Sequence, residues 1–365
     1  MTKILTSTLK KKVMSKKVCL LGDSLASGGA EKMIANLSKS IARKGYDVTI
    51  VIMQDDVAYD YEGRLYNFGQ IKANYTLFSG FMALKNFFKT ENFDIIFDHR
   101  IRNIWLKEFI LSKFIFSNFK VVYCVHHFEI WMYFPQFSIP FLSKLTLVKN
   151  REFVSVSIVI SQQIQSKLKL DSKVIYNYPE LPKSFTEIDV DFEYIIAIGR
   201  LEVIKQFDIL IDCYNASVLK ENDIKLLIFG DGSKHDELQE QISRLELCSH
   251  IYLKGFATNV SDYLVNAKGL VMTSKSEGFP MVLIEAISLK TPVVSFNFAS
   301  GPSEIISQNN NGILVKNQDK LEMITVLNKL VDNDFYSDLK KRLNNYDFPF
   351  KKENIIQQWI DIIEK

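Results

Sequence analysis

The sequence has few cysteines and no long apolar run. The four cysteines are scattered, and no two of them have the C-x-x-C spacing of a zinc or redox site. We expect buried, reduced thiols, which excludes a disulfide-rich secreted domain. No apolar run reaches about 18 residues, the minimum for a membrane-spanning helix, so we expect no membrane span. The cysteines are Cys19, Cys124, Cys213 and Cys248.

A secretion signal, internal repeats and low-complexity tracts are also missing. Residues 1–17 are basic, but the apolar stretch 18–21 is too short for the core of a signal peptide, and Asp23 follows it. The chain has 365 residues, of which 47% are hydrophobic and 24% are charged. This is enough for two domains with real cores. We therefore predict a cytoplasmic globular protein.

The net charge of +3 conceals an uneven distribution. Residues 1–185 hold 26 Lys and Arg against 15 Asp and Glu, whereas residues 186–365 hold 19 against 27. A basic half indicates an anionic partner. Nucleic acid, an acidic membrane and a phosphorylated acceptor all fit this asymmetry, and so does an uneven solvated surface.

Short apolar strands alternate with amphipathic helices, a pattern typical of parallel α/β domains. Residues 179–192 hold two prolines and little periodicity, and this indicates a linker. Strands restart after it, so we predict two doubly wound domains, 1–185 and 186–345. A helix within 346–365 is then placed to pack back on the first domain. The expected strands lie near 17–22, 47–53, 94–97, 120–125, 156–160 and 173–176, then at 194–198, 225–229, 251–253, 269–272 and 292–295.

Two glutamates flank the start of a predicted helix in the second domain. An apolar strand leads into a short loop, and a helix begins at Pro280, where a missing N–H costs nothing. Glu277 and Glu285 are eight residues apart, so their carboxylates lie at most roughly 12 Å apart. With the free N–H groups of Gly278 and Phe279, they suit a long polyhydroxylated anion such as a nucleotide sugar. A capped surface helix is the alternative.

Cations and glycines follow the other strands of the second domain. Next to Gly199, Arg200 offers a planar fork of donors and Lys205 a point charge, so both could neutralise a diphosphate. A surface ion pair between Arg200 and Glu202 is the alternative. At 255–256, a glycine and a phenylalanine ring could meet a base. Ligands of such domains bind at the carboxyl ends of the strands, so we expect these groups to share one cleft.

The first domain carries a glycine loop and paired histidines at strand ends. Gly28 and Gly29 precede a helix, so their amides can hold a phosphate, although no Walker A pattern follows. His126 and His127 end another strand, where a ligand contact and a core position are both open. Residues 98–100, Asp-His-Arg, end a third strand and are expected to line the same cleft.

Together these motifs resemble the retaining GT-B glycosyltransferases of family 4 (glycosyl transferases group 1). The resemblance runs in order along nearly the whole chain and is weakest at 55–155. The matching segments are 28–32 (Gly-Gly-Ala-Glu-Lys), 177–179 (Asn-Tyr-Pro), 199–201 with Lys205, 230–232 (Gly-Asp-Gly), 277–286 (Glu-Gly-Phe-Pro through Glu-Ala) and 301–306 (Gly-Pro-Ser-Glu-Ile-Ile).

The resemblance implies a fold and a set of roles. The fold is two Rossmann-like domains facing across a cleft, with the acceptor side first and the donor side second. The reaction moves a sugar from a nucleotide sugar, most often a UDP-sugar, to a glycan or lipid-linked acceptor, and it suggests bacterial surface polysaccharide synthesis. The implied catalytic residues are Arg200, Lys205, Glu277 and one of His126 and His127, and the implied donor-binding residues are Gly28, Gly29, Gly199, Gly255, Phe256, Gly278, Phe279, Pro280 and Glu285.

The resemblance also implies that no metal or other cofactor is needed, because fixed cations and helix N-termini stabilise the departing diphosphate. Two Asp-x-Asp matches, 189–191 and 332–334, lie in the linker and near a helix end. We do not expect either to chelate a metal.

Aromatic segments in the basic half suggest a peripheral membrane contact. Segments 109–119 and 128–141 are rich in aromatic residues, and Lys113, Lys120 and Lys144 lie within or beside them. This combination suits the inner face of an anionic membrane, although a buried core would have a similar composition. We expect no nucleic-acid partner.

Two other readings of the function are open. Residues 22–25, Gly-Asp-Ser-Leu, match the nucleophile block of GDSL esterases, in which Ser24 would attack an ester. The Asp-x-x-His block of that family is missing, since the last histidine is His250. A non-catalytic protein with the same fold is the third reading. Release of nucleoside diphosphate, cleavage of a chromogenic ester, or neither would distinguish the three.

Overall fold

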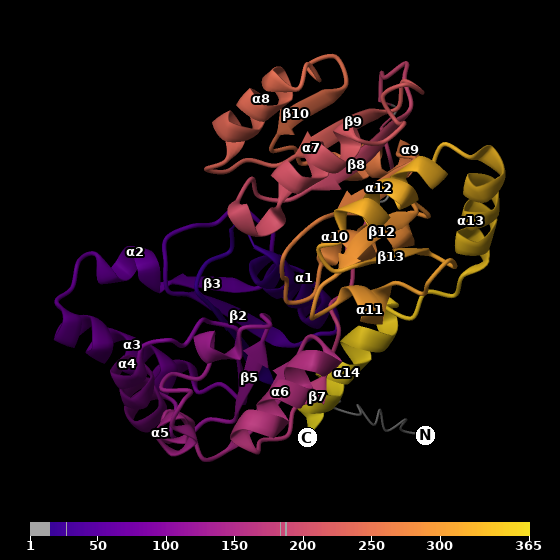
Figure 1. The fold of residues 1–365 in the computed structure, drawn as a ribbon. Helices are drawn as coiled ribbons and strands as arrows, with labels where there is room; N and C mark the ends of the chain where they lie inside the picture. The colour runs from indigo at the N-terminus through magenta and orange to yellow at the C-terminus, as the bar shows by residue number, and fades with distance from the viewer. Residues whose placement is uncertain (1–14, 27, 183, 187) are drawn as a thin grey trace, which may run out of the picture.

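The computed structural model describes residues 15–26, 28–182, 184–186 and 188–365. Each half of the chain builds one parallel sheet, and helices connect the strands of both (Figure 1). This confirms the α/β architecture predicted from the alternating pattern. Most of the basic N-terminal segment discussed above, residues 1–14, lies outside the described residues.

The N-terminal sheet has seven parallel strands. They are β1 (Lys17–Gly22), β2 (Asp47–Ile52), β3 (Arg64–Asn67), β4 (Ile95–Asp98), β5 (Val121–Val125), β6 (Arg151–Ser155) and β7 (Lys173–Val174). Their order across the sheet is β3-β2-β1-β4-β5-β6-β7. The central strands are continuous buried apolar runs, as expected when helices cover a parallel sheet. The order reverses between β1 and β4, which is where ligands of such sheets bind.

The C-terminal sheet has six parallel strands. They are β8 (Tyr194–Ile198), β9 (Lys225–Phe229), β10 (Ile251–Gly255), β11 (Gly269–Met272), β12 (Val293–Asn297) and β13 (Gly312–Lys316). Their order is β10-β9-β8-β11-β12-β13, so the order reverses between β8 and β11. The loops after β8 and β11 carry the predicted cations and glutamates.

Helices and short helical turns join these strands. In the N-terminal half they are α1 (Gly29–Arg43), α2 (Phe68–Lys72), α3 (Leu77–Glu91), α4 (Trp105–Ile110), η1 (Leu111–Ile115), η2 (Ile130–Met132), α5 (Pro140–Leu145) and α6 (Ile158–Leu168). In the C-terminal half they are η3 (Val203–Lys205), α7 (Phe207–Asn215), α8 (His235–Arg244), α9 (Val260–Asn266), α10 (Met281–Ser288), α11 (Pro302–Ile305), α12 (Lys320–Lys329), α13 (Asn333–Asn345) and α14 (Lys352–Glu364).

The last helix, α14, lies on the N-terminal half, away from α12 and α13 (Figure 1). Its Trp359 is buried, and its ring centroid is 5.2 Å from that of Phe97 in β4. Lys120 Nζ donates to the Ile362 carbonyl at 2.9 Å, and Tyr46 Oη donates to Glu364 at 2.6 Å. Helix α14 thus completes the core of the N-terminal half.

One strand prediction was wrong. Residues 156–160 do not form a strand, because β6 ends at Ser155 and α6 begins at Ile158. Ser157 caps α6, since its side chain accepts a hydrogen bond from the Ile160 amide at 3.2 Å. The apolar run 153–160 therefore continues from a strand into a helix. Strands β3, β6 and β13 were missed.

Within the residues that the structure describes, no helix is both long enough and apolar enough to cross a bilayer.

Candidate active site

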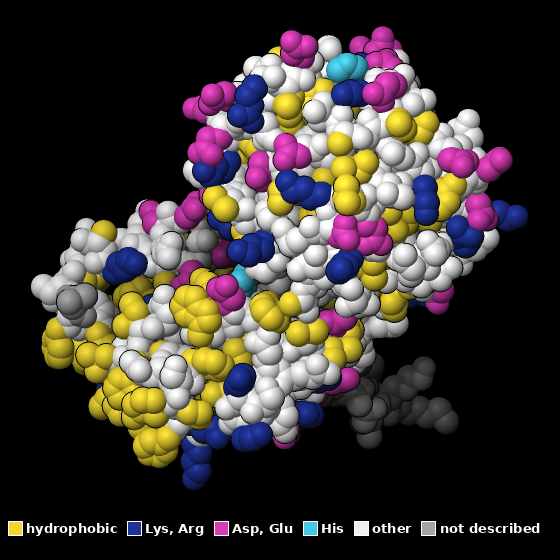
Figure 2. All heavy atoms as spheres, in the orientation of Figure 1, with side chains coloured by type: hydrophobic (Ala, Val, Ile, Leu, Met, Phe, Trp, Pro, Cys, Tyr) yellow, Lys and Arg dark blue, Asp and Glu magenta, His cyan; other side chains and the backbone are white. Residues whose placement is uncertain are grey.

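The two halves meet at the loop that follows β11. Gly278 in this loop lies against the main chain at the end of β5, where a Cβ atom on Gly278 would be 1.6 Å from the His126 carbonyl oxygen. Ser300 Oγ donates to the Gly278 carbonyl at 2.6 Å and lies 2.9 Å from Ser157 Oγ of the N-terminal half. Figure 2 shows the surface hollowed where the two halves meet. Loops at the carboxyl ends of both sheets therefore face each other.

Two strand ends of the C-terminal sheet are joined by an ion pair. Lys205 Nζ, in η3 after β8, forms a short ion pair with Glu277 Oε1 after β11. Ser274 Oγ donates to the same oxygen at 3.0 Å. The stem of Lys205 lies over Gly199, where a Cβ would be 3.1 Å from Lys205 Cε. Glu277 does not cap α10, whose N-cap is Pro280, so the capped-helix alternative is not supported for Glu277.

Glu285 is bonded across the boundary between the halves. The Lys32 Nζ atom of α1 lies 2.6 Å from Glu285 Oε1 of α10, and the two side chains are 37% and 16% exposed. Burial by itself would lower the pKa of Lys32, but the Glu285 carboxylate more than offsets this, and the pKa is raised. Both glutamates of the predicted motif therefore hold a lysine in this structure.

Arg200 is exposed at the end of β8. Glu202 accepts hydrogen bonds from the Ser233 hydroxyl at 2.9 Å and the Ser233 amide at 3.2 Å, and it forms no ion pair with Arg200 among the described residues. Burial raises the pKa of Glu31 and of Tyr59, and the charge of Arg200 acts in the opposite direction on both. The Arg200 charge therefore acts across the boundary between the halves, on groups of the N-terminal half.

His126 is buried and paired with a second histidine. His99 Nδ1 and His126 Nε2 are 2.7 Å apart, and their rings are stacked with centroids 5.0 Å apart. Burial lowers the pKa of His126 to about 4. Burial, together with the neighbouring His126, also lowers the pKa of His99 well below its usual range. Both rings are therefore neutral at pH 7, and one proton lies between them.

His127 has a different environment. It is half-buried, and its Nδ1 accepts a hydrogen bond from the Glu129 amide at 3.1 Å. The two adjacent histidines thus make separate contacts, and which of them faces a donor stays a prediction.

The glycine loop of the N-terminal half is unobstructed at Gly29 but not at Gly28, where a Cβ would be 1.9 Å from Glu31 Oε2. Gly28 is the N-cap of α1 and has no side-chain cap, and a Cβ on Gly29 would meet nothing within 4 Å. Phe279 and Pro280, which were also predicted to bind the donor, are buried. The centroid of the Phe279 ring lies 5.2 Å from that of Tyr176 in the N-terminal half. The Phe279 side chain therefore fills the contact between the halves.

Three predicted or neighbouring glycines converge at the ends of β8, β9 and β10. A Cβ on Gly230 would lie 1.9 Å from the Gly199 carbonyl oxygen, and the Gly230 amide donates to the Gly255 carbonyl at 2.8 Å. Gly230 has a φ of 135°, a conformation that favours glycine. Phe256 follows with its side chain 75% exposed, so its ring is free to meet another planar group.

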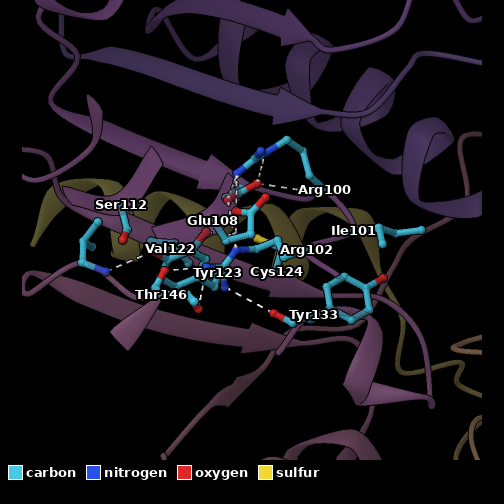
Figure 3. A network of polar contacts seen from close by, with 12 residues as sticks. Arg100, Ile101, Arg102, Glu108, Ser112, Val122, Tyr123, Cys124, Tyr133 and Thr146 are labelled. Carbon is cyan, nitrogen blue, oxygen red and sulfur yellow. Dashed lines mark hydrogen bonds and ion pairs between the residues drawn. The ribbon is translucent and has the colours of Figure 1, made fainter. Parts of the chain in front are cut away.

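Residues 98–100 do not line the cleft, contrary to expectation, because all three are buried. Asp98 and Arg100 belong to an ion network, in which Figure 3 labels Arg100, Arg102 and Glu108. Arg100 pairs with Asp98 at 2.8 Å and with Glu108 at 3.2 Å. Arg102 pairs with Glu108 at 3.1 Å, and its guanidinium carbon lies 4.2 Å from the Tyr123 ring centroid. Burial alone would lower the pKa of Arg100, but the two carboxylates raise it, so it stays charged.

The described residues contain no group of three or more His, Cys, Asp or Glu side chains that could hold a metal ion. In one Asp-x-Asp match, Asp332 caps α13 by accepting from the Asp334 amide at 3.0 Å. Metal independence stays a prediction.

Ser24 is buried, and among the described residues its Oγ accepts only a long hydrogen bond from the Ala26 amide, at 3.5 Å. No histidine is hydrogen-bonded to Ser24 in the part of the chain that the structure describes. The esterase reading lacks the base that it needs.

Two family models match the chain, one in each half. Residues 27–178 match Glycosyltransferase Family 4, and residues 181–347 match Glycosyl transferases group 1.

Comparison with known proteins gives the same picture. The chain is 33% identical over 167 residues to the poly(ribitol-phosphate) alpha-N-acetylglucosaminyltransferase of Staphylococcus aureus, a match to 45% of this chain and only 34% of that relative. It is 26% identical over 365 residues to the amylovoran biosynthesis glycosyltransferase AmsD of Erwinia amylovora, covering 95% and 99% of the two chains. The structure of Anabaena Alr3699/HepE in complex with UDP and glucose shares the fold, with a TM-score of 0.73 and 19% identity over 96% of this chain and 99% of that chain.

Proposed function

The chain belongs to the GT-B glycosyltransferases, since a family model matches each of its halves, and we propose that it is a retaining enzyme with a UDP-sugar as its donor. The sugar passes to a hydroxyl of a glycan or lipid-linked acceptor in bacterial surface polysaccharide synthesis. One observation carries the proposal: Lys205 with Glu277, and Lys32 with Glu285, meet at facing carboxyl ends of two parallel sheets. The Anabaena neighbour that holds UDP and glucose, and the relatives named for N-acetylglucosaminyl transfer and amylovoran biosynthesis, support the donor and product classes.

The proposed roles follow from charge. As the bond between the sugar and the diphosphate breaks, negative charge grows on the diphosphate, and Arg200 and Lys205 stabilise it without a metal ion. Glu285 accepts hydrogen bonds from the ribose hydroxyls, and Glu277 from a sugar hydroxyl. The amides of the Gly28–Gly29 loop approach the diphosphate at the N-terminus of α1.

Slow hydrolysis of the donor tests this proposal without knowledge of the acceptor. The protein, incubated with a panel of UDP-sugars, should release UDP from one of them and be thermally stabilised by the same compound. Activity should persist in EDTA, whereas complete loss that Mg²⁺ restores would demand a metal-dependent mechanism. Cleavage of a chromogenic ester instead would favour the esterase, and neither activity, with nucleotide binding retained, would favour a non-catalytic protein.

An exposed apolar patch on the N-terminal half supports a contact with an anionic membrane. Figure 2 shows hydrophobic side chains gathered over the region of α3, α4 and α5, with basic side chains beside them. The patch residues are 50% to 76% exposed, and they are Phe78, Ile104, Leu106, Phe114, Trp131, Ile139 and Phe141.

Only some of the residues expected from the sequence to contact a membrane belong to this patch. Phe116 and Phe119 are buried, and Lys120 is bonded to Ile362 and Glu152, so these residues do not belong to the patch. Lys113 lies in η1, directly after α4, where it also donates to the Leu147 carbonyl at 3.1 Å, and Lys144 lies in α5. Apolar side chains beside lysines suit the interface of an anionic bilayer, where a lipid-linked acceptor would be held.

Vesicle flotation tests the membrane contact. The protein should float with phosphatidylglycerol vesicles at low salt and much less with phosphatidylcholine vesicles or at high salt. Serine at both Leu106 and Phe141 should abolish flotation. Leu321→Ser, which removes a still more exposed apolar side chain (78%) from α12 on the other half, should not. Equal flotation of all variants would rule out this surface.

A further inference from the structure

Each of the two proposed donor-binding glutamates is occupied by a lysine. Lys205 is a partner from the same half, but Lys32 comes from the other half, 253 residues away in sequence. Glu285, which is proposed to accept hydrogen bonds from the ribose, is therefore already paired with Lys32. Donor binding has to displace Lys32 from this carboxylate. The Lys32 side chain is 37% exposed and the Glu285 side chain 16%, so the pair is partly open to solvent and ribose hydroxyls can compete with the ammonium group for the carboxylate.

Lys32 also lies in a cluster of charged and polar groups. Burial raises the pKa of Tyr59, and charged groups of both halves also act on this pKa. They are Lys32 and Glu31 of the N-terminal half and Glu285 and Arg200 of the C-terminal half. Lys32 is the fourth residue of α1, one turn from Gly29, whose Cβ position is unobstructed. An ammonium group there is near the place where a diphosphate would meet the helix N-terminus.

We propose that Lys32 is a mobile cation that exchanges Glu285 for the donor diphosphate. Without a ligand it neutralises Glu285, as the structure shows. When the donor binds, the ribose hydroxyls replace it on Glu285, and Lys32 turns to the diphosphate as a third cation beside Arg200 and Lys205. No covalent bond changes in this step. The inference rests on the proposed function and extends it by assigning a donor-binding role to an N-terminal residue.

Such an exchange predicts opposite effects on two ligands. In Lys32→Gln, Glu285 has lost its competing partner, so a nucleoside, which has a ribose but no phosphate, should bind several-fold more tightly. The matching nucleoside diphosphate has lost a cation, so it should bind about tenfold more weakly. A lysine that only fixes the structure would weaken both ligands together.

Titration calorimetry on the full chain, with uridine and UDP and then the adenosine and guanosine pairs, measures both effects. Lys32→Arg should restore the binding of the diphosphate. Lys39→Gln, on the same helix and without an ion pair in the described structure, should leave both affinities unchanged. If wild type binds UDP and Lys32→Gln shifts both ligands in the same direction, the exchange is refuted and the proposed function stands. If wild type binds none of the diphosphates, the proposed donor class is itself refuted, together with the exchange.

Discussion

Gly278 of the C-terminal half lies directly against the His126 carbonyl oxygen of the N-terminal half, so close that a Cβ atom would be 1.6 Å from that oxygen. The obstacle is main chain, which cannot rotate away as a side chain can. Gly278→Ala should therefore push the two halves apart and lower kcat/KM by at least about tenfold, since small misplacements of catalytic groups are costly. Gly80→Ala, where a Cβ makes ordinary contacts, is the control, and full activity of Gly278→Ala would contradict this geometry.

Gly29→Ala should behave differently, because a Cβ there meets nothing in the protein. We expect an unchanged melting temperature and weaker binding of the nucleotide sugar, since the methyl group would stand where the diphosphate approaches the amides. Thermal unfolding and donor titration on the same sample separate the two. Unchanged donor affinity would place the diphosphate elsewhere.

Arg200→Ala should reduce turnover by about 100-fold or more, because it removes a cation from the charge that develops in the transition state. The side chain is exposed and has no ion pair among the described residues, so the melting temperature should change little. Arg244→Ala, an exposed arginine on α8, is the matched control. Near-normal turnover of Arg200→Ala would remove Arg200 from the site.

Stability should fall in mild acid because of the pair His99 and His126. Burial lowers both pKa values, that of His126 to about 4, whereas unfolded histidines titrate near pH 6.5. Between these values the unfolded state binds more protons, so stability decreases as pH falls, by at most about 1.4 kcal/mol per pH unit for each histidine.

Urea unfolding between pH 6.5 and 5 measures this slope, above the range where most carboxylates titrate. The double variant His99→Asn with His126→Asn should lose most of it. Identical slopes for wild type and variant would mean that the pair is protonated in the folded protein.

Arg100→Met should destabilise the fold strongly, because it leaves the Asp98 and Glu108 carboxylates buried with less compensation. Breaking a buried pair in this way costs about 3–5 kcal/mol. Arg43→Met breaks an exposed pair with Glu62 and should shift the unfolding midpoint little. Equal midpoints for the two variants would show that the network contributes no stability.

The buried strands were predictable from sequence because a covered parallel sheet needs continuous apolar runs. The error at 156–160 arose where such a run passes through the cap Ser157 into a helix. Strand β3 was missed because it lies at the edge of the sheet and none of its residues is buried.

The residues at strand ends were predictable as a group, because parallel strands bring their carboxyl ends to one edge of a sheet. Their partners were not. No local sequence pattern relates the segments that these contacts join. The contacts are the pairs Lys32–Glu285, His99–His126 and Arg100–Glu108. Such contacts depend on how the two halves and the later helices pack.

The chain passes between its halves twice, first between β7 and β8 and again between α13 and α14. Two connections restrict the relative rotation of the halves more than one connection would. Removing α14 would remove one of these connections and leave a cavity beside Phe97, where Trp359 packs. The C-terminal helix thus joins the two halves at a second place, so a separation of the halves has to bend both connections.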